Sequence, residues 1–81
     1  MNEAEIKTRL NGIFREIFDD ESIEISDTTT AEDIEDWDSL SHINLIVATE
    51  KAFKVKFTTR EVQSLANVGD FIKLVARRLS Q

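Results

Sequence analysis

Cysteine, proline and tyrosine are all absent from this chain of 81 residues, and it has only two glycines, one histidine and one tryptophan. Without cysteine, the protein can form neither a disulfide framework nor a thiolate metal site. Any thiol that its chemistry requires must therefore come from a cofactor. The absence of proline and tyrosine decides nothing further.

Long apolar runs are also missing. No stretch approaches the ~20 apolar residues that span a bilayer, and residues 1–5 lack the basic start and apolar core of a signal peptide. The sequence therefore predicts a cytoplasmic protein that does not enter a membrane. Its length predicts a single domain, residues 1–81, with a small core.

Basic residues are missing from one segment in particular, residues 19–38, which holds ten acidic side chains. Residues 39–81 hold three acidic and seven basic ones, within an overall net charge of −6. A concentrated acidic surface attracts basic partners and repels nucleic acid. We therefore expect protein partners and no nucleic acid. A solvated loop that only keeps the protein soluble is the simpler alternative.

Apolar residues recur at helical spacing in four segments, which predicts an all-α protein. The first helix covers residues 2–18, and the second begins near Ser39. A short third helix opens at the capping box Thr58–Glu61, and the last follows a cap at Asn67. Gly12 is expected to mark close approach of another helix. The prediction is a small helical bundle of three main helices plus one short helix, with a long loop between helices 1 and 2.

The long loop carries four apolar residues that we expect to hold it against the core, namely Ile23, Ile25, Ile34 and Trp37. Alternation in residues 22–26 and 54–57 permits a two-stranded ribbon, but an isolated ribbon is marginal. We therefore expect extended anchoring without a sheet. Specific calcium binding is not expected, because the loop lacks the turn glycine and the terminal glutamate that calcium loops use.

The segment Asp36-Trp37-Asp38-Ser39-Leu40 joins this loop to the second predicted helix. Asp38 is a suitable N-cap, because its carboxylate can accept hydrogen bonds from the first turn. Ser39 then falls at about the first helical position, where the helix dipole suits a phosphate group. Apolar residues from Leu40 to Phe53 form a broad face, so we expect this helix to be the most buried one.

The serine motif and its surroundings resemble the modification site of acyl carrier proteins. The resemblance rests on Asp38-Ser39-Leu40, entered from Trp37 and followed by Ile43, Leu45, Ile46 and Phe53. It extends over nearly the whole chain through Phe53-Lys54-Val55-Lys56-Phe57 and Asn67-Val68-Gly69-Asp70. In that family the serine receives a 4′-phosphopantetheine arm, whose terminal thiol holds acyl groups as thioesters.

The resemblance implies that Ser39 carries this cofactor. A separate phosphopantetheinyl transferase attaches it from coenzyme A through a phosphodiester, and Asp38 helps to hold the magnesium ion during that transfer. The carrier itself catalyses nothing and presents its cargo to acyl-activating, condensing or acyl-transfer enzymes. We expect a monomer that docks on them through five residues, namely Trp37, Leu40, Ile43, Val47 and Glu50.

His42 is close enough in sequence to share a helix face with Asp38 and Ser39. A Ser-His-Asp hydrolase also needs an oxyanion hole and a substrate pocket, which one exposed turn does not supply. We therefore expect His42 to be an exposed contact or a partner of Asp38.

The second predicted helix differs from that of carriers in bulk fatty-acid synthesis, which is strongly acidic. Here Glu50 is its single acidic residue, beside Lys51. This favours a specialised fatty-acid, polyketide or modified-lipid pathway. A peptidyl or amino-acyl carrier is one alternative. A non-catalytic helical interaction module, whose acidic loop docks on a basic protein, is the other.

Overall fold

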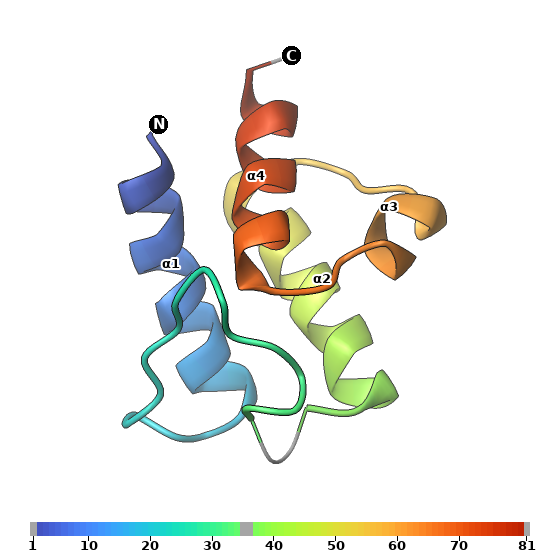
Figure 1. Ribbon diagram of the computed structural model, residues 1–81. Helices are drawn as coiled ribbons and strands as arrows, with labels where there is room; N and C mark the ends of the chain where they lie inside the picture. Colours follow the sequence, from blue (N-terminus) through green and yellow to red (C-terminus); the bar gives the residue numbers. More distant parts are fainter. Residues whose placement is uncertain (1, 35–36, 81) are drawn as a thin grey trace.

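The computed structural model describes residues 2–34 and 37–80, which form four helices and no strand (Figure 1). The helices are α1 (Glu3–Ile17), α2 (Ser39–Phe53), α3 (Thr59–Gln63) and α4 (Val68–Leu79). The prediction of an all-α bundle of three main helices and one short helix is confirmed. None of the helices in the described ranges is long and apolar enough to cross a membrane.

Each helix begins at a residue whose side chain accepts a hydrogen bond from the first turn, as the sequence predicts. These N-caps are Asn2, Asp38, Thr58 and Asn67. At α3 the bonding is reciprocal, because Thr58 accepts from the backbone N–H of Glu61 while the Glu61 carboxylate accepts from that of Thr58. These bonds satisfy N–H groups that a helix cannot pair internally.

The core lies where α1 packs against both α2 and α4 (Figure 1). Helix α4 buries five apolar residues, namely Val68, Phe71, Ile72, Leu74 and Val75. Helix α2 buries four residues, namely Leu45, Ile46, Thr49 and Phe53, and leaves other large apolar side chains in solvent. The expectation that α2 is the most buried helix is therefore wrong.

The first connection is anchored to the core without forming a strand in its described part, which confirms the prediction. Ile25 is buried, and three further apolar residues are partly buried against the core, namely Ile23, Ile34 and Trp37. Two polar side chains of α1 add to this anchoring. Asn11 Oδ1 accepts from the backbone N–H of Ile25 at 2.8 Å, and Arg15 Nε donates to the carbonyl oxygen of Ile23 at 2.7 Å. Two of the ten acidic residues in the segment 19–38, Glu35 and Asp36, lie outside the described ranges.

The same connection is bonded to the first turn of α4. The backbone N–H of Val68 donates to the Thr29 carbonyl oxygen at 2.8 Å, and that of Gly69 donates to the Asp27 carbonyl oxygen at 2.9 Å. A Cβ atom at Gly69 would lie only 2.8 Å from this Asp27 oxygen, so glycine is what permits the approach. At Gly12 the corresponding space is open, and the prediction of a close helix approach there is wrong.

Candidate functional site

Ser39 is exposed and is the first residue of α2. Its neighbour Asp38 has extended backbone angles and turns the chain into the helix, where its carboxylate accepts from the Ser41 backbone N–H at 2.8 Å. This hydrogen bond is the main reason that the pKa of Asp38 lies below its usual value. The serine hydroxyl is therefore carried on the end of a capped helix, in reach of solvent and of an enzyme.

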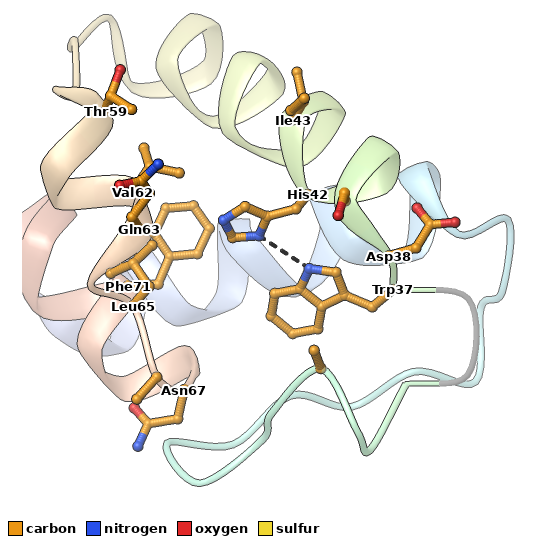
Figure 2. Close-up of a pocket in the computed structure, with 13 residues that line it drawn as sticks. Trp37, Asp38, His42, Ile43, Thr59, Val62, Gln63, Leu65, Asn67 and Phe71 are labelled. Carbon is orange, nitrogen blue, oxygen red and sulfur yellow. Dashed lines mark hydrogen bonds between the residues drawn. The ribbon is translucent and has the colours of Figure 1, made fainter.

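The indole ring of Trp37 connects this helix start to α1. It packs edge-on against Phe14, with ring centroids 5.2 Å apart at an interplanar angle of 85°. On α2 it stacks with His42 at 5.9 Å and 22°, and its Nε1–H donates to His42 Nδ1 at 3.1 Å (Figure 2). His42 is thus half-buried and paired with Trp37, which differs from the prediction of an exposed contact or a pair with Asp38.

A sequence signal for the Trp37–His42 pair is present. With Asp38 as N-cap, Trp37 occupies the position before the cap and His42 the fourth helical position. These are the two positions that a hydrophobic staple joins. The usual pattern has two apolar residues there, so a histidine at the second position obscures the signal.

A cavity of about 650 Å³ adjoins Ser39. It lies between the beginning of α2, the α3 region and the beginning of α4, as Figure 2 shows. Its lining includes Ser39, Trp37 and His42 on one side and Val62, Leu65 and Phe71 on the other. The exposed Ser39 therefore adjoins a largely apolar space that can hold a small molecule.

Three large apolar side chains of α2 are exposed, namely Leu40 (68%), Ile43 (59%) and Val47 (42%). Spacings of three and four residues place them on one face of the helix, which we call the apolar stripe. The two other predicted docking residues have internal contacts. Trp37 is partly buried, and the Glu50 carboxylate accepts from the Phe57 backbone N–H at 2.9 Å.

Charge differs between the two ends of α2. Asp38 precedes the helix, whereas Lys51, Lys54 and Lys56 are exposed at and after its end. Within residues 2–34 and 37–80, no group of three or more His, Cys, Asp or Glu side chains is arranged to hold a metal ion.

Comparisons with known proteins agree with this arrangement. Residues 8–75 match the family model described as a phosphopantetheine attachment site. The chain is 32% identical to an acyl carrier protein of Acidothermus cellulolyticus over 76 residues, which is 94% of this chain and 90% of that one. Its fold is similar to the solution structure of holo acyl carrier protein from Geobacter metallireducens, with a TM-score of 0.88 and 49% identity. That match covers 93% of this chain and 86% of the other.

The chain belongs to the phosphopantetheine-attachment family of carrier proteins. It is an acyl carrier protein, whose cofactor is covalently bound 4′-phosphopantetheine. Proteins of this kind catalyse no reaction themselves. An exposed serine beside a cavity of small-molecule size is compatible with a flexible attached arm.

Proposed function

We propose that Ser39 is the residue that carries the 4′-phosphopantetheine arm and that the protein presents acyl thioesters on it to separate enzymes. The observation that supports this most is the exposure of Ser39 at the first position of capped helix α2. The positive end of the helix dipole lies there, and it favours the negative charge of a phosphodiester. Coenzyme A would supply the phosphopantetheine. The Ser39 oxygen would form a new ester bond to the phosphorus that bears the pantetheine, while the P–O bond of the pyrophosphate bridge breaks, adenosine 3′,5′-bisphosphate leaves and the hydroxyl proton passes to a base of the transferase or to water.

Intact mass tests the attachment site. The protein is incubated with a broad-specificity phosphopantetheinyl transferase, coenzyme A and Mg²⁺, and we expect one adduct per chain. Ser39→Ala should gain no mass. Ser41→Ala is the matched control, because it removes a hydroxyl from the same helical turn, and it should still gain one adduct. Loading of Ser39→Ala, or no loading of the unchanged protein, would contradict the proposal.

We further propose that the apolar stripe is the surface that docks on the transferase and on acyl-activating, condensing or acyl-transfer enzymes. Its side chains are exposed from the residue after Ser39 to just over two turns beyond it, and burying exposed apolar area on binding is favourable. Trp37 and Glu50 would contribute less directly, because each already has an internal partner. Glu50→Lys is therefore a poor docking test, since it would also remove the acceptor for Phe57.

Val47→Asp tests the stripe, because docking would then require the desolvation of an unpaired carboxylate. We expect kcat/KM for loading by the transferase to fall by about tenfold, which corresponds to ~1.4 kcal/mol. Ala52→Asp adds the same charge to an exposed position on another side of α2, and should change kcat/KM little. Equal losses in both variants would show that charge alone is responsible.

A specialised fatty-acid, polyketide or modified-lipid pathway remains our proposal for the biological setting. The support is the charge pattern of α2, which has a half-buried glutamate and one exposed lysine near its end and is followed by the exposed Lys54 and Lys56. The monomeric state, the single domain over residues 1–81 and the cytoplasmic location stay predictions.

A further inference from the structure

The hydrogen bond between Trp37 and His42 decides which imidazole nitrogen carries the proton. An indole N–H can donate but cannot accept. His42 Nδ1, which receives this hydrogen bond at 3.1 Å, is therefore unprotonated. In the neutral imidazole the proton is then on Nε2, and that nitrogen is a donor.

The position of Nε2 relative to the cavity is visible in Figure 2, where it lies on the side of the His42 ring that faces the α3 region. His42 lines the same cavity as Ser39, with the apolar side chains of Val62, Leu65 and Phe71 across from it. Within residues 2–34 and 37–80, the recorded hydrogen bond of the His42 side chain is the one from Trp37. The Nε2–H group thus faces a largely apolar space, and no hydrogen bond from it to a described residue is recorded, although polar side chains such as Gln63 and Asn67 also line the cavity.

The pair is also held in place. Trp37 packs against Phe14 on one side and stacks with His42 on the other. A donor whose direction is set before a ligand arrives loses less entropy when it forms its hydrogen bond. This arrangement is suited to recognising an acceptor at one place in the cavity.

We infer that His42 Nε2–H is a binding group for an oxygen acceptor, a carbonyl or hydroxyl oxygen, on the molecule attached to Ser39. The inference rests on the proposed attachment at Ser39. A purely hydrocarbon chain in the cavity would remove water from Nε2–H and leave that donor unsatisfied, which is unfavourable. A group with an oxygen at this place avoids the penalty, so the cavity favours oxygenated over purely hydrocarbon occupants.

The acceptor has three possible sources, and three loaded forms distinguish them. Holo protein offers only the oxygens of the arm itself, hexanoyl protein adds the thioester carbonyl, and 3-hydroxyhexanoyl protein adds a hydroxyl. Each form is made with the transferase and the corresponding coenzyme A derivative, and intact mass verifies loading. Failure to load would count against the attachment proposal. The inference about His42 is tested separately, by NMR on protein whose loading has been verified.

Nitrogen NMR of the imidazole is the direct measurement, and His42 is the single histidine of the chain. At mildly alkaline pH, apo protein should show Nδ1 unprotonated and Nε2 protonated. The opposite tautomer in apo protein would overturn the inference before any loading. In at least one loaded form, exchange of the Nε2 proton with water should slow by about two- to tenfold, as expected for one hydrogen bond of ordinary net strength.

The forms are compared in the order holo, hexanoyl and 3-hydroxyhexanoyl. The first of them to show slow exchange identifies the oxygen as belonging to the arm, the thioester carbonyl or the hydroxyl, respectively. Unchanged exchange in all three forms would overturn the inference. Trp37→Phe keeps an aromatic ring but removes the indole N–H, so both tautomers of His42 should appear and the protection should decrease. If Trp37→Phe keeps the fold, by circular dichroism, and also keeps full protection, Trp37 does not position the donor and the inference is wrong.

Discussion

Helices α2 and α4 begin in the same way but use their apolar residues differently. Each has an Asp or Asn N-cap that accepts from the backbone N–H three residues later. The large apolar residues of α4 are buried or half-buried, and its exposed positions include Lys73 and Arg77. Helix α2 divides its apolar residues between the core and the exposed apolar stripe. Burial of a Leu, Ile or Val side chain is worth roughly 1.5–3 kcal/mol, so a helix that leaves three of them exposed gives up stability that another molecule can recover.

The largest effect on stability should come from comparing an isoleucine-to-alanine substitution in α4 with the same substitution in α2. Ile72→Ala in α4 removes a buried side chain that is 2% exposed, whereas Ile43→Ala in α2 shortens one that is 59% exposed. We expect the first to lower the free energy of unfolding by about 2–5 kcal/mol and the second to change it by no more than about 0.5 kcal/mol. Urea denaturation followed by circular dichroism measures both. Similar losses would mean that the exposed face of α2 supports the fold after all.

The start of α4 should be sensitive to one added methyl group. Gly69→Ala places a Cβ against the Asp27 carbonyl oxygen and should destabilise the protein by about 1–3 kcal/mol. Gly12→Ala is the matched control in α1, where the space is open, and it should stabilise by about 0.5–1 kcal/mol because alanine is the better helix former. Thermal unfolding shows whether each substitution raises or lowers the melting temperature. Equal signs would contradict the close approach at Gly69.

The two caps should differ in their response to acid, because Asp38 titrates and Asn67 does not. The pKa of Asp38 is lowered in the folded protein, chiefly by the Ser41 backbone N–H. Its stabilising contribution is therefore complete above the unfolded value of about 3.9 and is lost as the pH falls through the lower folded value. Asp38→Asn should consequently lose less stability than the unchanged protein between neutral pH and about pH 3.

Asn67→Asp is the converse change, since it gives α4 a titrating cap, and it should lose more stability over the same range. Glu61, whose pKa is lowered to about 2 by the Thr58 backbone N–H and by Arg78, titrates in all these proteins and forms a common background. Urea midpoints measured at several pH values decide the comparison. Parallel profiles for the three proteins would show that the caps do not contribute to the acid response.

The smallest effect on stability should come from Ser39→Ala. The side chain is exposed and alanine is a good helix former, so the free energy of unfolding should change by no more than about 0.5 kcal/mol. Its melting temperature is compared with that of Ser41→Ala. A large decrease for Ser39→Ala would indicate a structural role for the hydroxyl.

Features that depend on neighbouring residues could be predicted from the sequence. The caps at Asp38, Thr58 and Asn67 each involve a bond across three residues, and all were expected at the residues where they occur. Ile43 and Val47 are exposed, as expected, and their docking role stays a prediction.

Features that depend on distant segments could not be predicted. Gly69 is constrained by Asp27, which is 42 positions away, while Gly12 has no such neighbour, and no local pattern separates the two. The carboxylate of Glu50 is recognisable as a docking candidate, but its hydrogen bond to Phe57 depends on how the chain turns after α2. We expected His42 to be an exposed contact or to pair with Asp38, but its partner is Trp37. Helical spacing relates residues within the helix, and Trp37 precedes the N-cap.

The two bonds from the first turn of α4 to the first connection also have a kinetic consequence. They join residues about forty positions apart, at Val68 with Thr29 and at Gly69 with Asp27. Contacts of such long range form at a high cost in chain entropy and tend to appear late in folding. Residues 27–29 and the beginning of α4 should therefore open as one unit. The Val68 and Gly69 amides should exchange their hydrogens together, at rates that report on the order of a segment distant in sequence.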